Sequence, residues 1–382
     1  MDHIPVDTLY HATVISADAE TTARHHSEFY GVERWDVTDF TPDRLTNQTI
    51  FGRVPTAPPP LDLSTPNPTP GTFGFRLARG TTPNGAITFN IVQPTGGLST
   101  FEEFLVTRGP GIQGMCMTSV DKAGAEDLKS FFRGESIRLA QSYTVPGVAE
   151  FLYFDTRADL GGYYVEAIVP LVDDWQAAMP VDTTWSFEID EARAAYSRTS
   201  PGITHFGVIV PQLRPVIERS AKLFGRDLWR GMHWRTEPGS LEEPTNNGKP
   251  VKHSYFTGRA DLGKNSLGQP FGLEIVQPVF GPSHYKEDFL EPLGAGIHHI
   301  DLKVPMADWA EWEKFSEWLL EDMDAPVCMS GWLRDKVALF EYHDLRPRLG
   351  YVVELVAPLM PHCPKKPWAP DYWYDFAGSQ AS

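Results

Sequence analysis

Apolar and polar residues alternate most regularly in two segments of the second half of the chain. Residues 202–210 (GITHFGVIV) and 296–304 (GIHHIDLKV) are rich in β-branched side chains with a two-residue period, which is typical of strands. After the second segment, apolar residues recur every three or four positions through 309–319, which predicts an amphipathic helix. Two further apolar segments, 271–278 and 351–358, each hold one glutamate four positions before a proline. The pattern therefore predicts two similar units, each running from a strand through a helix to further strands.

The first half of the chain repeats this plan. Its opening strands are predicted at 9–15 and 111–117, and its closing strands at 88–94 and 163–170. Residues of the two halves correspond at offsets of 184 to 194 positions in four pairs: His11 with His205, Asn90 with Glu274, Gly114 with His299, and Glu166 with Glu354. A duplicated two-unit domain explains this regularity, because a nearly constant offset marks a repeated structural unit.

The repeat and the chain length together predict the domain organisation. A chain of 382 residues is long enough for two domains of about 150–200 residues. We expect an N-terminal pair of units over 1–175, a linker over 176–200, a C-terminal pair over 201–362 and a tail over 363–382. Seven prolines between positions 55 and 70 predict an exposed insertion or an ordered loop in the first domain.

Composition narrows the classes of function. A formal net charge of −17 at pH 7 disfavours nucleic acid and anionic membranes as partners, because both select for basic surfaces. The three cysteines form no Cys-x-x-Cys pair, so any metal must be held by nitrogen and oxygen. No apolar run approaches the roughly 20 residues of a membrane helix, and the N-terminus resembles no signal peptide. We therefore expect a cytoplasmic protein.

Four side chains within the predicted strands carry the candidate chemistry. A glutamate buried in an apolar strand costs several kcal/mol unless a cation or hydrogen bonds compensate it. Two such glutamates, Glu274 and Glu354, occur at matching positions of units that also carry the matching histidines His205 and His299. Two imidazoles and two carboxylates suit one divalent transition metal, namely Zn, Co, Ni, Mn or Fe(II). The alternative is a pair of buried His–Glu hydrogen bonds without a metal.

The repeated units resemble the βαβββ modules of the vicinal oxygen chelate superfamily, which includes glyoxalase I, methylmalonyl-CoA epimerase and the extradiol dioxygenases. The Gly-Ile-His-His-Ile opening at 296–300, together with the two Glu-x-x-x-Pro closing strands, carries this resemblance, which covers nearly the whole chain. The resemblance implies an α+β fold of four modules paired into two domains. It also implies a metal held by His205, Glu274, His299 and Glu354, with His298 pointing away.

A reaction class follows from the same resemblance. Members of the superfamily use the metal to polarise a carbonyl or two vicinal oxygens of a small molecule, here an aromatic compound or an acyl thioester. Proton abstraction at the adjacent carbon would make the chain an epimerase, an isomerase or a glyoxalase-type lyase, with Glu354 and Glu274 as ligand and base. The N-terminal half departs from the pattern at Asn90 and Gly114, so we expect a degenerate copy of the site there.

Two other functions stay open at this point. An Fe(II) ring-cleaving dioxygenase would use His205, His299 and Glu354 as a two-histidine, one-carboxylate triad, although Glu274 would then close a position that dioxygen and substrate need. A metal-free small-molecule binding protein would keep the four side chains hydrogen-bonded in pairs. A monomer and a homodimer both fit four modules in one chain.

Other side chains give weaker predictions. Arg226, Arg230 and Arg235 are candidates for a carboxylate or phosphate group of the substrate, although arginines on strands and helix ends are more often solvated. His25 and His26, in the predicted helix before Gly31, are expected to face solvent. Five ring-bearing residues near the predicted cleft strands would suit an aromatic or sizeable apolar substrate, although such residues more often fill a large core: Trp229, His233, Trp234, Trp332 and Tyr342.

Overall fold

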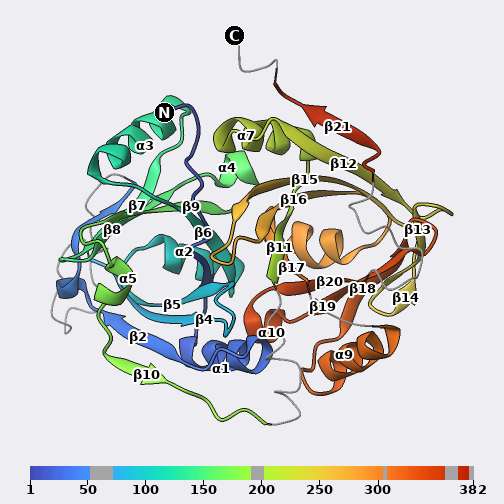
Figure 1. Cartoon of the computed structure of the whole chain (residues 1–382), viewed down its shortest axis with the longest axis horizontal. Helices are drawn as coiled ribbons and strands as arrows, with labels where there is room; N and C mark the ends of the chain where they lie inside the picture. Colours follow the sequence, from blue (N-terminus) through green and yellow to red (C-terminus); the bar gives the residue numbers. More distant parts are fainter. Residues whose placement is uncertain (52–71, 191–201, 304–307, 358–368, 378–382) are drawn as a thin grey trace, which may run out of the picture.

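Two curled mixed β-sheets lie side by side and form the two halves of the molecule (Figure 1). The computed structural model describes residues 1–51, 72–190, 202–303, 308–357 and 369–377. The predicted α+β class is confirmed, whereas the proline-rich stretch at 55–70 lies outside the described residues. No helix within the described ranges is long and apolar enough to cross a membrane.

The first sheet has ten strands in the described part of the chain, in the order β10-β2-β4-β5-β1-β6-β9-β8-β7-β3. The strands are β1 (His11–Ile15), β2 (Trp35–Phe40), β3 (Thr46–Ile50), β4 (Gly74–Thr81), β5 (Thr88–Gly96), β6 (Gly111–Ser119), β7 (Leu139–Val145), β8 (Ala149–Phe154), β9 (Tyr164–Pro170) and β10 (Thr183–Trp185). The helices of this half are α1 (Ala19–Tyr30), α2 (Thr100–Arg108), α3 (Lys122–Gly134), α4 (Arg157–Leu160) and α5 (Trp175–Ala178), with a 3-10 turn, η1, at Pro42–Arg44.

The second sheet has eleven described strands, in the order β14-β13-β18-β19-β20-β17-β11-β16-β15-β12-β21. The strands are β11 (Gly202–Ile209), β12 (Leu228–Arg235), β13 (Leu241–Asn246), β14 (Lys249–Pro250), β15 (Ser254–Lys264), β16 (Pro270–Phe280), β17 (Gly296–Lys303), β18 (Val327–Leu333), β19 (Ala338–Asp344), β20 (Val352–Ala357) and β21 (Tyr372–Asp375). Its helices are α7 (Leu213–Phe224), the π-helix η3 (His284–Leu290), α8 (Glu291–Leu293), α9 (Trp309–Glu321) and α10 (Arg346–Leu349).

The centre of each sheet has the same strand pairing. In the first sheet β1 and β6 are antiparallel, and each has a parallel strand on its outer side, β5 and β9. In the second sheet β11 and β17 are antiparallel, flanked by the parallel strands β16 and β20. Thr13 of β1 lies opposite Asn90 and Gly114, as Gly207 of β11 lies opposite Glu274 and His299. The strand registers therefore match the correspondence between the halves that the sequence predicts.

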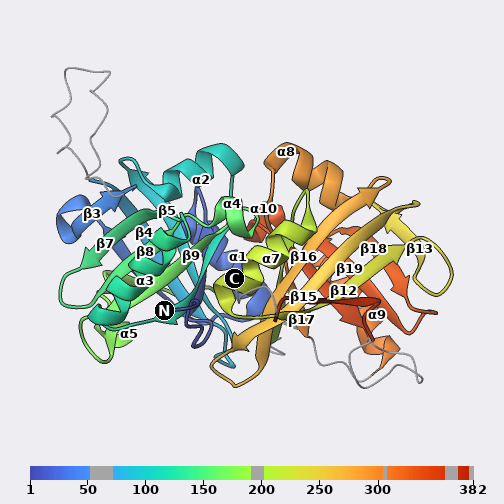
Figure 2. The ribbon, with the colours of Figure 1, turned by 90° about the horizontal axis from the view of Figure 1, so that it is seen from above.

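Helices and one hydrophobic core join the two halves. Helix α1 packs against α10 and α4 packs against α7, so helices of each half meet between the sheets (Figure 2). The largest core cluster contains residues of both halves, including Phe29 and Trp318, whose rings stack at 6.1 Å. Helix α1 begins at the N-cap Asp18, whose side chain accepts from the Thr21 N–H, and ends at Gly31 in the left-handed region.

His26 lies at this junction, so the prediction that it faces solvent is wrong. Its side chain is fully buried, and burial lowers its pKa to about 3. Its Nε2 lies 3.1 Å from the hydroxyl of Tyr351, and its Nδ1 lies 2.9 Å from the carbonyl of Thr22. The rings of Trp35 and Phe89 from its own half and of Tyr351 from the other half cover it.

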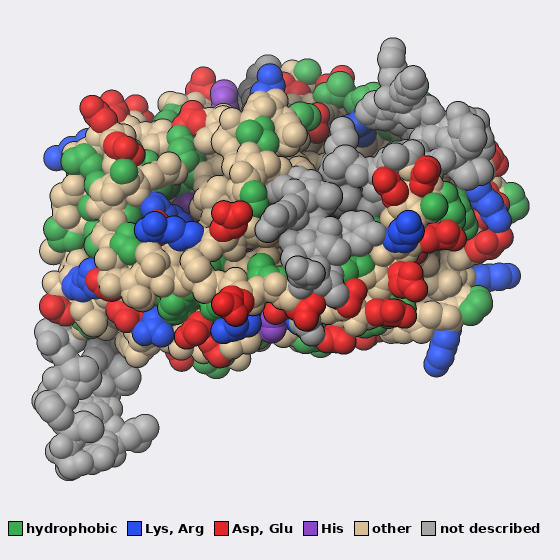
Figure 3. All heavy atoms as spheres, turned by 60° about the horizontal axis from the view of Figure 1, so that its bottom comes forward, with side chains coloured by type: hydrophobic (Ala, Val, Ile, Leu, Met, Phe, Trp, Pro, Cys, Tyr) green, Lys and Arg blue, Asp and Glu red, His purple; other side chains and the backbone are tan. Residues whose placement is uncertain are grey.

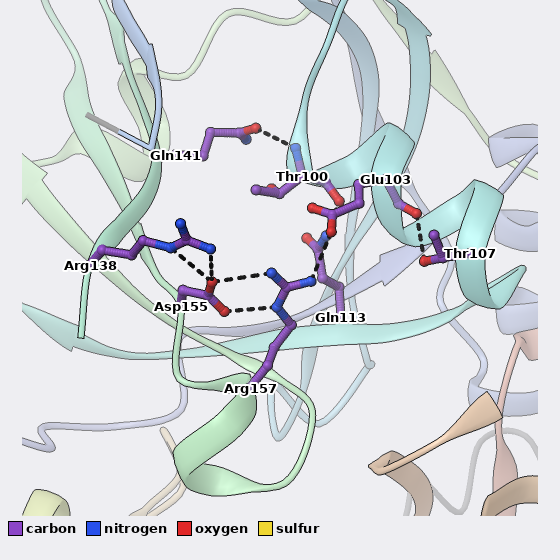
Figure 4. A network of polar contacts seen from close by, with 8 residues as sticks. All are labelled: Thr100, Glu103, Thr107, Gln113, Arg138, Gln141, Asp155 and Arg157. Atoms are coloured by element: carbon purple, nitrogen blue, oxygen red, sulfur yellow. Dashed lines mark hydrogen bonds and ion pairs between the residues drawn. The ribbon is translucent and has the colours of Figure 1, made fainter. Parts of the chain in front are cut away.

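A polar network ties α2 to the strands of the first half (Figure 4). Arg157 donates to Asp155 and to Glu103 of α2, at 2.7 and 3.0 Å. The side chain of Gln141 accepts from the backbone N–H of Thr100 at 2.9 Å, which satisfies one free N–H at the start of α2. On the outer surface, acidic and basic side chains are interspersed over the face that Figure 3 shows.

Candidate metal centre

The four predicted side chains meet on four neighbouring strands at the centre of the second sheet. His205 lies on β11, Glu274 on β16, His299 on β17 and Glu354 on β20. One donor atom from each side chain lies within 4.8 Å of those of the other three. Because these strands are adjacent in the order β20-β17-β11-β16, the register of the sheet brings together residues up to 149 positions apart.

The distances within the group are uneven. Glu354 Oε2 lies 3.1 Å from His205 Nε2 and 3.2 Å from His299 Nε2. Glu274 Oε2 lies farther away, at 3.4 Å from His205 Nε2 and 3.9 Å from His299 Nε2. The Glu274 side chain is also more exposed, at 15% against 8% for Glu354. The two histidines and Glu354 thus form a tight, buried group, and Glu274 stands at its more accessible edge.

The chemistry of these donors fits a divalent cation. His205 Nε2, His299 Nε2 and Glu354 Oε2 are buried and have no hydrogen-bond partner among the described residues. Leaving a buried polar atom unpaired costs about 1–3 kcal/mol. Three such atoms that face one another, with a second carboxylate at 3.4 Å, are the mixed nitrogen and oxygen set that transition metals accept.

The pKa values of Glu354 and His205 also fit a cation site. Burial alone would raise the pKa of Glu354, but its interactions with His205 and His299 outweigh burial and hold that pKa well below the usual range. Burial and the charge of Arg259 would lower the pKa of His205, but the carboxylates of Asp301 and Glu274 together raise it well above the usual value. The carboxylates therefore hold a proton on His205, and a bound divalent cation would take the place of that proton.

The outer nitrogen of each histidine ring has its own partner. His205 Nδ1 lies 3.2 Å from Asp301 Oδ2 and 3.0 Å from the hydroxyl of Thr204. Asp301 lies directly opposite His205 in the pairing of β11 with β17. A hydrogen bond from Nδ1–H to a carboxylate leaves Nε2 with its lone pair free and fixes the plane of the ring.

A chain of buried histidines supports His299 in a similar way. His299 Nδ1 lies 3.0 Å from His298 Nδ1, and His298 Nε2 lies 2.8 Å from His284 Nδ1. His284 Nε2 lies 3.8 Å from Asp344, whose carboxylate accepts from Arg346 at 2.6 Å. Each ring can donate to the next, so the series directs the N–H of His299 away from the site. His298 thus points away from the four donors, as the resemblance implied.

The N-terminal half contains no equivalent group among its described residues. There His11 Nε2 lies 3.2 Å from Glu166 Oε2, so the two retained residues pair with each other. A Cβ atom at Gly114 would lie 2.6 Å from Glu166 Oε1 and 2.7 Å from the carbonyl of Tyr164, which leaves no room for a histidine. The cavity beside His11 and Asn90 measures only about 20 Å³. The retained His11 and Glu166 therefore form a buried His–Glu pair. Such a pair is the alternative to a metal site that the sequence left open for the C-terminal half.

A cavity of about 240 Å³ opens beside the four side chains of the C-terminal half. His205, Glu274 and Glu354 line it, whereas His299 lies behind them. Aromatic rings form much of the remaining wall: Trp234, Tyr255, Tyr285, Phe340 and Tyr342. Burial raises the pKa of Tyr255, Tyr285 and Tyr342 well above the usual value, so these hydroxyls stay protonated.

Sequence reasoning found part of this wall and missed part of it. Of the five ring-bearing residues predicted near the cleft, Trp234 and Tyr342 line the cavity. Trp229 lies in the hydrophobic core, and Trp332 stacks on Trp309. Asp301 was missed, although an acidic residue two positions after His299 on the same strand face was a usable signal.

Comparison with known proteins adds the fold. No protein-family model matches this sequence, and no curated protein matches it at a significant level. A triple mutant of 4-hydroxymandelate synthase from Streptomyces coelicolor is similar in structure, with 13% identity and a TM-score of 0.50 over 92% of this chain and 92% of that one. Methylmalonyl-CoA epimerase from Mycobacterium tuberculosis matches with 18% identity and a TM-score of 0.31, over 47% of this chain and 97% of that one. The Mn(II)-bound glyoxalase from Novosphingobium aromaticivorans matches with 9% identity and a TM-score of 0.44, over 98% of this chain and 99% of that one.

These solved structures are members of the vicinal oxygen chelate superfamily. The likeness to the synthase extends over both sheets, because it covers 92% of the chain. Together with the matching strand registers of the two halves, it means that this chain has the fold of the vicinal oxygen chelate superfamily.

Proposed function

We propose that this chain is a metal-dependent enzyme in which His205, Glu274, His299 and Glu354 hold one divalent transition metal. One observation carries the proposal: three buried donor atoms of this group face one another without a hydrogen-bond partner in the described part of the chain. The ordered outer contacts of both histidines add support, because metal-binding histidines usually hold their second ring nitrogen in a hydrogen bond. Zn, Co, Ni, Mn and Fe(II) all suit this donor set.

The reaction we propose begins with removal of a proton from the carbon next to a carbonyl of a small-molecule substrate. A bound divalent metal would supply Lewis-acid stabilisation for the negative charge on the substrate oxygens. Glu274 is the better placed base, since it is the more exposed glutamate, lies farther from both histidines and lines the cavity. Glu354 lies between both imidazoles and acts mainly as a ligand.

The destination of the proton decides the type of reaction. Return to the opposite face of the same carbon is epimerisation, and return to a neighbouring atom is isomerisation or the final step of a glyoxalase-type lyase. Tyr285 donates to the hydroxyl of Tyr342 at 2.6 Å, so the protonated hydroxyls of Tyr342 and Tyr255 can donate into the cavity and would stabilise an oxyanion. We assign the chain to this isomerase and lyase group.

An Fe(II) ring-cleaving dioxygenase is the second candidate, because one observation favours it. Glu354 Oε2 lies 3.1 Å from His205 Nε2 and 3.2 Å from His299 Nε2, whereas Glu274 Oε2 lies 3.4 Å from His205 Nε2. A two-histidine, one-carboxylate triad with open positions is the ligand set of such enzymes. Glu274 still stands against it, because its carboxylate lies 3.4 Å from His205 Nε2 and lines the cavity, where dioxygen and substrate would need open positions.

We extend the proposal to the organisation of the chain. The pair of modules over 201–362 would hold the metal, and the pair over 1–175 would support it through the shared core. The stretch 176–200 would connect the two and 363–382 would be a tail, although β10 and β21 from these stretches add edge strands to the two sheets.

Elemental analysis of the purified protein tests the proposal. We expect about one transition metal per wild-type chain, lost in His299→Ala and in Glu354→Ala. His11→Ala is the matched control, since it removes a buried histidine that is paired with a glutamate in the N-terminal half and should keep the metal. Iron together with oxygen uptake on catechols would favour the dioxygenase. A wild-type protein that takes up neither zinc, manganese nor Fe(II) after reconstitution would contradict the proposal and favour a metal-free binding protein.

A further inference from the structure

We propose that Arg259 binds a carboxylate group of the substrate, so that the molecule on which this chain acts is a small aromatic or apolar carboxylic acid. The inference rests on the function proposed above and deepens it by naming a charge on the substrate and the residue that selects it. Arg259 stands apart from the predicted ligands and from the three arginines that sequence reasoning singled out.

Arg259 enters the same cavity as the candidate metal ligands. It lies on β15 directly opposite Glu274 on β16, and it lines the cavity of about 240 Å³ together with His205 and Glu354. A molecule that reached the four donors would therefore lie beside this guanidinium.

The guanidinium of Arg259 lacks a partner within the described part of the chain. Its Nε is buried without a hydrogen-bond partner there, and none of the ion pairs between described residues includes it. The three predicted arginines all have partners: Arg226 donates to the carbonyl of Leu262, Arg235 pairs with Glu237 at 2.7 Å, and Arg230 lies 3.6 Å from Asp261. Among these four arginines, Arg259 thus lines the cavity and has N–H groups that can still bind an anion.

A single carboxylate is the group that satisfies this arginine best. A guanidinium keeps its proton in a protein, and its planar N–H groups match the two oxygens of a carboxylate, so the buried Nε–H of Arg259 is left to bind such a group. Asp301, Glu274 and Glu354 already surround the histidines, and they would repel a dianion such as a phosphate monoester. The site therefore favours a monoanion.

The walls indicate what else the substrate carries. Five aromatic side chains line the cavity, which is suited to a ring or another apolar group. A volume of about 240 Å³ lies below the usual range for drug-sized ligands, so the bound part of the substrate is small. Of the two substrate classes that the sequence left open, the aromatic compound is the one that this cavity favours.

Paired probes that differ only in charge test the proposal on the metal-loaded full chain. We would measure the dissociation constants of 3-phenyllactate and of its uncharged amide, 3-phenyllactamide, by calorimetry. Both present the same ring and two neighbouring oxygens, so the affinity ratio of acid to amide reports the carboxylate. The variants are Arg259→Met, Arg259→Lys and the control Arg235→Met, an arginine of the next strand that is paired with Glu237.

We expect the wild type to prefer the acid, and Arg259→Met to reduce the acid-to-amide ratio about ten- to a hundredfold. Arg259→Lys should restore part of the preference, Arg235→Met should leave the ratio unchanged, and all variants should keep wild-type metal content. An unchanged ratio in Arg259→Met, or no binding of either probe to the metal-loaded wild type, would overturn the proposal. Metal analysis separates the two hypotheses. If the wild type binds metal and Arg259→Met leaves the acid-to-amide ratio unchanged, only this inference is rejected. If the wild type binds no metal and Arg259→Met still reduces the ratio, only the proposed function is rejected.

Discussion

The ring of His299 lies where the side chain of residue 207 would be. A Cβ atom at Gly207 would lie 1.8 Å from His299 Cε1 and 2.0 Å from its Nε2, far below any real contact. The two residues face each other across β11 and β17, so the missing side chain of one makes the space for the imidazole of the other. Gly207 is therefore required for the geometry of the candidate metal centre.

A methyl group at position 207 should consequently displace His299. We expect Gly207→Ala to weaken metal binding about tenfold or more, because ring displacement separates Nε2 from the other donors. Metal affinity measured by competition with a chelator checks this. Gly134→Ala in α3 is the matched control, since a Cβ atom there would meet nothing within 4 Å. Equal metal affinity in both variants would refute the role of Gly207.

The two glutamates should differ in how much they contribute to metal affinity. Glu354 Oε2 lies within 3.2 Å of both imidazoles, whereas Glu274 Oε2 lies 3.4 and 3.9 Å away and is more exposed. We expect Glu354→Gln to weaken metal binding roughly tenfold more than Glu274→Gln, because a buried carboxylate interacts with a cation more strongly than a partly solvated one. Chelator competition on the two purified variants measures the ratio, and a larger loss in Glu274→Gln would reverse our assignment of ligand and base.

The buried histidine series should affect the metal from a distance. His284 contacts no donor of the group, yet it holds His298, which in turn holds His299. We expect His284→Gln to weaken metal binding about 10–100-fold, the usual range for residues that orient a ligand. His343→Gln is the control, because His343 is equally buried in the same half but contacts the Ala325 carbonyl at 3.0 Å. Similar metal affinities for both variants would show that the series has no orienting role.

The N-terminal half should resist conversion into a second metal site. Glu166 and Tyr164 fill the space around Gly114, and Thr13 occupies the strand position that Gly207 has in the other half. We expect the double variant Asn90→Glu, Gly114→His to remain at about one metal per chain and to be less stable than wild type, since overpacking costs about 1–3 kcal/mol. Elemental analysis and chemical denaturation measure both effects. Two metals per chain in this variant would contradict the steric argument.

His26 should make stability depend on pH. Burial lowers its pKa from 6.5 to about 3, so below pH 6.5 the unfolded chain takes up a proton at this residue and the folded chain does not. The folded state therefore loses stability as pH falls from about 6.5 to about 3. We expect the free energy of unfolding to fall between pH 7 and pH 4.5 in both proteins. The fall should be about 2–3 kcal/mol smaller in His26→Phe than in wild type. Denaturant titrations at both pH values measure this, with the exposed His3→Phe as control; an identical loss in wild type and His26→Phe would contradict it.

The sequence by itself determined the repeated plan and the four candidate ligands. Alternation with a two-residue period reports strands directly, because successive side chains of a strand point to opposite faces. A glutamate inside an apolar strand is also a local signal, since burial of a carboxylate needs compensation wherever the strand lies. Those two signals located His205, Glu274, His299 and Glu354, and they marked Asn90 and Gly114 as departures in the other half.

Only the tertiary structure decided the contacts that join distant parts of the chain. Gly207 makes room for His299, and His284 supports His299 through His298. Arg259 enters the cavity with its Nε unpaired among the residues that the structure describes. None of these relationships follows from spacing along the sequence. His26, predicted on the surface, is buried under Trp35 and Phe89 of its own half and Tyr351 of the other half. The physical reason is common to all of them: local periodicity gives the face on which a side chain lies, but strand register, sheet curvature and the packing of the two halves decide what that face meets.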